Sequence, residues 1–144
     1  MKIALFLISF LLLSCGTDQG SRDTYAYTLK NESGVTIKII GYAGVETHTI
    51  ILNNKQDYTQ VYEDGKPPRG YHFRFLFGSS DGNREATSIK IVYNNLKFKV
   101  YSSDNLSDER NPLGPNHNNG GLEAIYTITQ QDYENAEDCT GNCN

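Results

Sequence analysis

Short stretches in which apolar and polar residues alternate, each followed by a turn sequence, constrain this chain more than any other feature. The first of them places Tyr25, Tyr27 and Leu29 on one side of an extended chain. A two-residue period is typical of a β-strand that buries one face. The alternation predicts strands at residues 25–29, 35–42, 47–52, 58–62, 73–77, 88–93, 96–101 and 122–128.

Turn sequences separate these stretches at intervals of about 8–12 residues, a spacing typical of all-β folds. Residues 130–137 predict at most a short helical turn. The adjacent Pro67 and Pro68 exclude a central strand from the loop at residues 64–70, because proline cannot donate a ladder hydrogen bond. We therefore predict an all-β fold with a single antiparallel β-sandwich, Ig-like or jelly-roll-like, and a small β-barrel as the alternative.

Residues 88–101 form the clearest predicted hairpin, with a two-residue Asn-Asn turn at residues 94–95 that suits positive φ. This turn places Lys90 opposite Lys99, and like charges directly across a strand pair are destabilising. One interpretation is that a neighbouring acid or solvent relieves the repulsion. The other is that Lys90, Lys97 and Lys99 form a small basic patch that binds an anionic glycan or a partner.

The first 15 residues differ from the rest of the chain. Lys2 supplies positive charge, and residues 3–13 form an apolar run that is too short to cross a bilayer, which takes about 20 helical residues. The run ends in Leu-Leu-Ser-Cys at residues 12–15. This ending resembles the lipobox of bacterial lipoproteins, in which an apolar residue and a small residue precede the cysteine.

The resemblance implies how the protein is processed and where it resides. In that family the cysteine sulfur receives a diacylglycerol, and a signal peptidase cuts just before the cysteine, so the lipid bilayer is the expected partner of acylated Cys15. Gly16 stands where the inner-membrane retention signal has Asp, which implies the outer membrane, facing the periplasm or the cell exterior. Leader and size resemble small lipoproteins of Bacteroidota-type cells. The implied organisation is a signal peptide (1–14), lipidated cysteine and tether (15–23), β-sandwich (24–138) and cysteine-containing tail (139–144).

The charge of the chain bears on its partners. Thirteen basic and 17 acidic side chains give a net charge of −4. Nucleic-acid binding rewards net positive charge, because the phosphate backbone supplies most of the affinity. We therefore do not expect a nucleic-acid partner.

Two cysteines remain after Cys15, and the implied compartment is oxidising. Cys139 and Cys143 are predicted to form a small disulfide loop. A loop this short contributes about 2 kcal/mol at most, so the bridge ties off the tail rather than holding the core. A redox pair is the alternative, but the residues lack the C-x-x-C spacing and the helix N-terminus that lower a thiol pKa.

Residues 78–82 spell G-x-S-x-G around Ser80, and His117 follows later in the chain, in the order that a hydrolase uses. A nucleophile elbow needs a strand, a turn and a helix, whereas here the strand at residues 88–93 follows the turn. We therefore expect no enzyme, with a hydrolase built on Ser80 and His117 as the alternative.

Metal ligands are not grouped at known spacings. His48, His72 and His117 stand singly, outside any H-x-x-x-H pattern. The oxygen-rich residues 81–83 and 102–110 match no calcium-loop spacing. No metal and no cofactor are expected.

The remaining candidate surface combines a strand and two loops. Tyr58 and Tyr62 share one face of a predicted strand and could stack on a sugar or a peptide. The long loop at residues 102–121 and the loop at residues 64–70 would complete the surface. We expect a membrane-anchored, non-catalytic binding or envelope-structural module with a glycan or protein partner. The alternative is an inhibitor or immunity-type protein that caps another protein.

Overall fold

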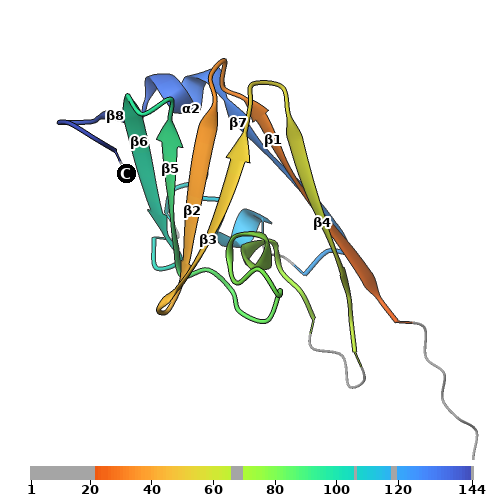
Figure 1. The fold of residues 1–144 in the computed structure, drawn as a ribbon. Helices are drawn as coiled ribbons and strands as arrows, with labels where there is room; N and C mark the ends of the chain where they lie inside the picture. Colours follow the sequence, from red (N-terminus) through yellow and green to blue (C-terminus); the bar gives the residue numbers. More distant parts are fainter. Residues whose placement is uncertain (1–21, 66–69, 106, 118–119, 144) are drawn as a thin grey trace, which may run out of the picture.

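The computed structural model describes residues 22–65, 70–105, 107–117 and 120–143. These residues form eight strands in two sheets that pack face to face (Figure 1). The leader and Cys15 lie outside the described residues. Within the described part, no helix is both long enough and apolar enough to cross a membrane.

The smaller sheet has three strands in the order β4–β1–β7. Strand β1 (Thr24–Glu32) lies in the centre and pairs antiparallel with β4 (Asp57–Glu63) over the whole length of β4. On its other side β1 pairs with β7 (Glu123–Thr129), and this pair is parallel. The first and the last long strands of the described chain are therefore neighbours.

The larger sheet has five strands in the order β3–β2–β5–β6–β8, all antiparallel. Its members are β2 (Ile37–Ala43), β3 (Glu46–Leu52), β5 (Ser88–Tyr93), β6 (Lys97–Ser102) and the two-residue β8 (Glu137–Asp138). The sheets do not close into a barrel, so the predicted all-β sandwich is confirmed. The parallel β1–β7 pair is the one departure from antiparallel pairing among the described strands.

The core fills the space between the sheets with aromatic and branched side chains. Tyr27 and Tyr126 of the small sheet face Ile39, Ile91 and Tyr93 of the large sheet, and all five are at most 2% exposed. The alternation read from the sequence is visible in β1, where every second residue from Tyr25 is buried. Alternation therefore predicted the inner face of β1 correctly.

One predicted strand is wrong. Residues Phe73–Phe77 form a 3-10 helix, η1, although they alternate as a strand would. Four of its five side chains are buried, so η1 is a plug inside the sandwich rather than a ladder partner. The backbone of η1 passes so close to β2 that a Cβ on Gly41 would lie 1.7 Å from the Phe77 carbonyl oxygen.

The hairpin of β5 and β6 forms, but its predicted register is wrong. The connection has three residues, Asn94 to Leu96, and both asparagines have positive φ, as predicted. Lys90 consequently pairs with Val100, and Lys99 pairs with Ile91. A one-residue slip moves every side chain of a strand to the opposite face, so Lys97 and Lys99 point inward and Lys90 points outward.

The two ends of the sandwich carry different segments (Figure 1). Strand β1 begins at the end that we call the N-terminal end, where the Asp64 amide donates to the Asp23 carbonyl at 2.9 Å. The opposite end, the distal end, carries the turns at residues 33–36, 53–56 and 94–96 together with helix α2 (Gln130–Glu134). Helix α2 confirms the predicted short helical turn.

The contact between η1 and β2 generates a stability prediction. Gly41→Ala should lower the free energy of unfolding by about 3 kcal/mol or more, because the methyl group and the Phe77 carbonyl cannot occupy the same space. The matched control is Gly65→Ala, where a Cβ would meet no atom within 4 Å and the change should stay within about 0.5 kcal/mol. Urea unfolding of both variants measures the difference. Equal stabilities would contradict the close approach.

Candidate functional site

Asn31, at the distal end of β1, joins two turns through one buried side chain. Its amide group donates to the Val35 carbonyl at 2.8 Å and to the Leu52 carbonyl at 3.0 Å. Its side-chain oxygen accepts from the Ser33 amide and hydroxyl at 3.1 and 2.6 Å. The main chain of Asn31 adds hydrogen bonds with Lys55 and Gln56. Asn31 is fully buried, so this network fixes the turns at residues 33–36 and 53–56 relative to each other.

Further hydrogen bonds connect the same turns. The Gly34 amide donates to the Asn54 side chain at 3.1 Å, and the Thr36 hydroxyl donates to the Asn53 side chain at 3.2 Å. Gly34 and Lys55 have φ of 86° and 64°, the left-handed conformation that tight turns use. Hydrogen bonds within the chain therefore fix the turns of the distal end.

A concave site of about 580 Å³ lies beside these turns, and we call it the distal hollow. Its size is within the usual range of small-molecule sites. Lys30 and Asp57 form an ion pair of 3.8 Å in its wall. The lining is entirely polar apart from glycine, with charges of both signs: Lys30, Glu32, Gly34, Asn54, Lys55, Asp57 and Gln130. Such a surface binds through hydrogen bonds and charge, without an aromatic ring for stacking.

The tyrosines predicted as a stacking surface lie on the inner face of β4. Tyr62 is 8% exposed, and its ring stacks on Tyr71 with centroids 4.8 Å apart. Tyr58 is half-buried and donates to Gln60 at 3.1 Å. The prediction that Tyr58 and Tyr62 share a face is confirmed, but that face belongs to the core. Burial, the main cause, raises the pKa of both hydroxyls.

The three lysines predicted as a basic patch are not on one surface. Lys90 points to the outer face of the large sheet, where it lies 5.1 Å from the centre of the Phe98 ring. Lys97 and Lys99 point inward from strand β6. Lys97 pairs with Asp138 at 3.3 Å and donates to the Ala136 carbonyl at 3.1 Å. Lys99 lies 5.7 Å from the centre of the Tyr101 ring.

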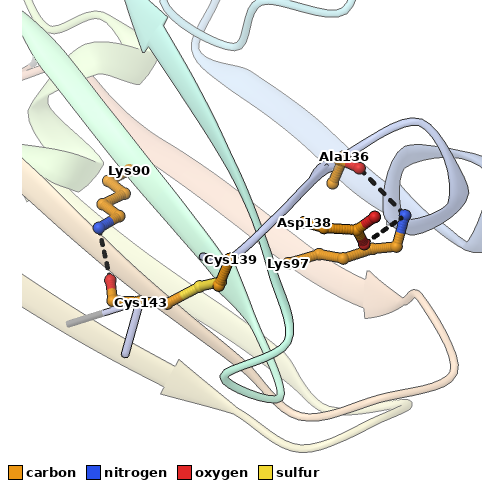
Figure 2. Close-up of a disulfide and its surroundings, with 6 residues drawn as sticks. All are labelled: Lys90, Lys97, Ala136, Asp138, Cys139 and Cys143. Carbon is orange, nitrogen blue, oxygen red and sulfur yellow. Dashed lines mark hydrogen bonds and ion pairs between the residues drawn. A yellow bond between two sulfur atoms is a disulfide. The ribbon is translucent and has the colours of Figure 1, made fainter. Parts of the chain in front are cut away.

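The C-terminal residues 137–143, which we call the strap, run from the edge of β6 to the outer face of the large sheet (Figure 2). Strand β8 pairs with Lys97 and Phe98, and the Cys139 amide donates to the Leu96 carbonyl at 2.9 Å. Cys139 and Cys143 are at disulfide distance, with Cα atoms 5.6 Å apart, as predicted. Lys90 donates to the Cys143 carbonyl. The strap thus explains what two of the three lysines do.

The loops predicted to complete a ligand surface start from the N-terminal end, and the longer one reaches helix α2 through Arg110. At the base of residues 64–70, the buried Asp64 carboxylate accepts from Gly65 at 2.8 Å and Gly70 at 2.9 Å. In the loop of residues 102–121, the buried Asn111 amide donates to the carbonyls of Ser102 and Asn105. Residues 66–69, 106 and 118–119 lie outside the described residues, and no described residue of either loop lines the distal hollow.

Ser80 does not stand in a nucleophile elbow. It is exposed in a turn organised by the Ser79 hydroxyl, which accepts from the amides of Asn83 and Arg84 at 3.1 and 3.0 Å. The chain then enters β5, so no helix follows the serine. His117 packs edge-on against the Tyr126 ring, with centroids 5.0 Å apart. The strand, turn and helix of a nucleophile elbow are therefore absent from residues 70–105.

An arginine–aspartate cluster was not predicted. The Arg110 Nε donates to Asp132 at 2.9 Å, and its guanidinium lies 4.9 Å from the centre of the Tyr126 ring. Burial raises the pKa of Asp132, but the hydrogen bonds from Arg110 and Thr129 outweigh it and hold that pKa below 3.8. Asp132 also closes a capping box with Thr129. The motif T-x-x-D could have indicated the cap, but the partner of Arg110 carries no sequence signal.

Comparison of the chain with protein-family models, curated proteins and solved structures found no match. Within the described ranges, no group of three or more His, Cys, Asp or Glu side chains could hold a metal ion. The distal hollow and the leader are therefore the features that bear on function.

The network around Asn31 generates the second prediction. Asn31→Ala should lower the free energy of unfolding by about 3 kcal/mol, because it removes the buried amide that donates to the Val35 and Leu52 carbonyls and accepts from Ser33. Asn54→Ala, which removes one exposed hydrogen bond, should cost less than about 1 kcal/mol. Chemical denaturation compares the two variants. Similar losses would show that Asn31 does not anchor the turns.

The third prediction concerns pH. Burial lowers the pKa of His117 below its ordinary value of 6.5, so the unfolded chain binds this proton more readily than the folded chain. Stability should therefore fall as the pH drops below about 6.5, until the folded residue is protonated as well. His117→Gln should flatten this decrease between pH 7 and pH 5 in thermal melts. The lowered pKa of His48 leaves a residual slope, and identical slopes in both proteins would refute the assignment.

Proposed function

We propose that this protein is a lipid-anchored, non-catalytic binding module of the bacterial cell envelope, and that its distal hollow holds a polar ligand. Acylated Cys15 supplies the anchor, and the sandwich supplies a rigid support for the site. The ligand class is a glycan or peptide of the envelope that is recognised through hydrogen bonds and charge.

The position of the hollow carries this proposal. Residues 16–21 separate Cys15 from the described domain, and six extended residues span at most about 20 Å. The N-terminal end of the sandwich would therefore stay close to the bilayer. The distal hollow lies at the other end and would face away from the membrane (Figure 1).

The rigidity of the hollow supports binding rather than a purely structural role. A site whose turns are already fixed loses little conformational entropy when a ligand binds. Asn31 is 0% exposed and holds both turns in place. Six of the seven described lining residues carry charged or amide side chains, which favours a polar ligand over a lipid tail.

The anchor is tested by substitution of the cysteine. Cys15→Ala should abolish labelling by a palmitate analogue. Once the leader has been removed by cleavage or truncation, this variant should move from the detergent phase to the aqueous phase. A Cys139→Ser, Cys143→Ser double variant, which keeps Cys15, should be labelled like the wild type. Undiminished labelling of Cys15→Ala would end the anchor proposal.

The site is tested by exchanging two of its charges. A Glu32→Lys, Lys55→Glu double variant keeps the net charge but reverses the sign of the charge at two positions of the lining. It should weaken ligand binding by about tenfold, which is the contribution of one charged hydrogen bond. Glu123→Lys, an exposed change at the N-terminal end, is the control. Calorimetric titration of the detergent-solubilised protein with peptidoglycan fragments and surface polysaccharides measures both. Binding that is lost only in Glu123→Lys would move the site elsewhere.

A further inference from the structure

We infer that the Cys139–Cys143 bridge is a thiol–disulfide exchange site at which an external dithiol opens the strap, with Cys139 as the sulfur attacked. The inference goes beyond the proposed function, because neither the hollow nor the anchor takes part in it. It rests on the unequal surroundings of the two sulfurs and on the position of Lys90.

The two cysteines differ in access. Cys143 is 3% exposed, whereas Cys139 is half-buried and remains open to solvent. Exchange requires a thiolate to reach a sulfur, so access decides which sulfur is attacked. Cys139 is therefore the point of attack, and Cys143 is the leaving group.

Lys90 favours this direction of exchange. Its ammonium group donates to the carbonyl of Cys143, so a positive charge is held at the residue that must leave as a thiolate (Figure 2). Nearby cations lower a thiol pKa, and a thiol of lower pKa is a better leaving group.

The chemistry is an ordinary two-step exchange. A thiolate of the dithiol attacks the Cys139 sulfur, the bridge breaks, and Cys143 leaves as a thiolate that takes up a proton. The second thiol of the reductant then attacks the mixed disulfide and releases Cys139, which is protonated in turn. Two electrons and two protons pass to the chain, and the dithiol becomes a disulfide.

Opening the bridge has a local consequence. The strap before Cys139 is held by two residue pairs with β6 and by Lys97, whereas the bridge and the Lys90 hydrogen bond tie Cys143 to the sheet. Reduction should therefore raise the mobility of residues 140–143, while the sandwich stays folded.

The site of attack is tested on the full-length protein with glutathione as the probe. Glutathione is added, the freed thiol is trapped with iodoacetamide, and peptide mass spectrometry assigns each adduct. Glutathione should be found on Cys139 and the alkyl group on Cys143, in at least about a tenfold excess over the reverse pattern. An equal mixture, or glutathione mainly on Cys143, would overturn the inference.

The role of Lys90 and the release of the strap are tested in parallel. Lys90→Gln should slow reduction by dithiothreitol by about threefold, whereas Lys99→Gln, which removes a lysine that contacts no strap residue among the described contacts, should not. Hydrogen exchange after reduction should rise in residues 140–143 and stay unchanged in β2. Equal reduction rates in both variants, or a loss of protection throughout the sandwich, would overturn the inference.

Discussion

The saturated hydrogen bonding of Asn31 is the interaction on which the distal half of the structure depends. Two of the crossings between the sheets at this end lie next to Asn31, from β1 to β2 and from β3 to β4. One buried amide bonds to the main chain on both crossings. The hydrogen bonds of Asn31 thus have two effects: they align the two sheets, and they shape the wall of the distal hollow.

Alternation and turn residues predicted much of the fold, because a strand with one buried face has apolar and polar residues in alternation. They failed where packing overrides the period. Phe73–Phe77 alternates as a strand would, yet these residues form the 3-10 helix η1 and fill the core. Gly41 allows the backbone of η1 to pass close to that of β2. The Asn-Asn turn was found, but one additional loop residue, Leu96, reversed the faces of β6.

The candidate site was less predictable than the fold. Turn sequences between the predicted strands were recognised. No local sequence pattern, however, predicts which of these turns lie next to each other in the fold. Tyr58 and Tyr62 share a face, as their spacing requires, and only the three-dimensional structure shows that this face is the core. The inward positions of Lys97 and Lys99 follow from the register of the β5–β6 pair, which the predicted two-residue turn did not give.

The parallel pairing of β1 with β7 governs the order in which the chain can fold. Thr28 has Ile125 as its neighbour, about a hundred residues further along, so the central strand of the small sheet stays half-paired until almost all of the polypeptide has been made. A chain that emerges from a ribosome or a translocon with its N-terminus first must therefore keep an open strand edge for most of its passage. A chain that stops before β7 would leave that edge permanently unfilled, so the small sheet is complete only once synthesis has passed Thr129.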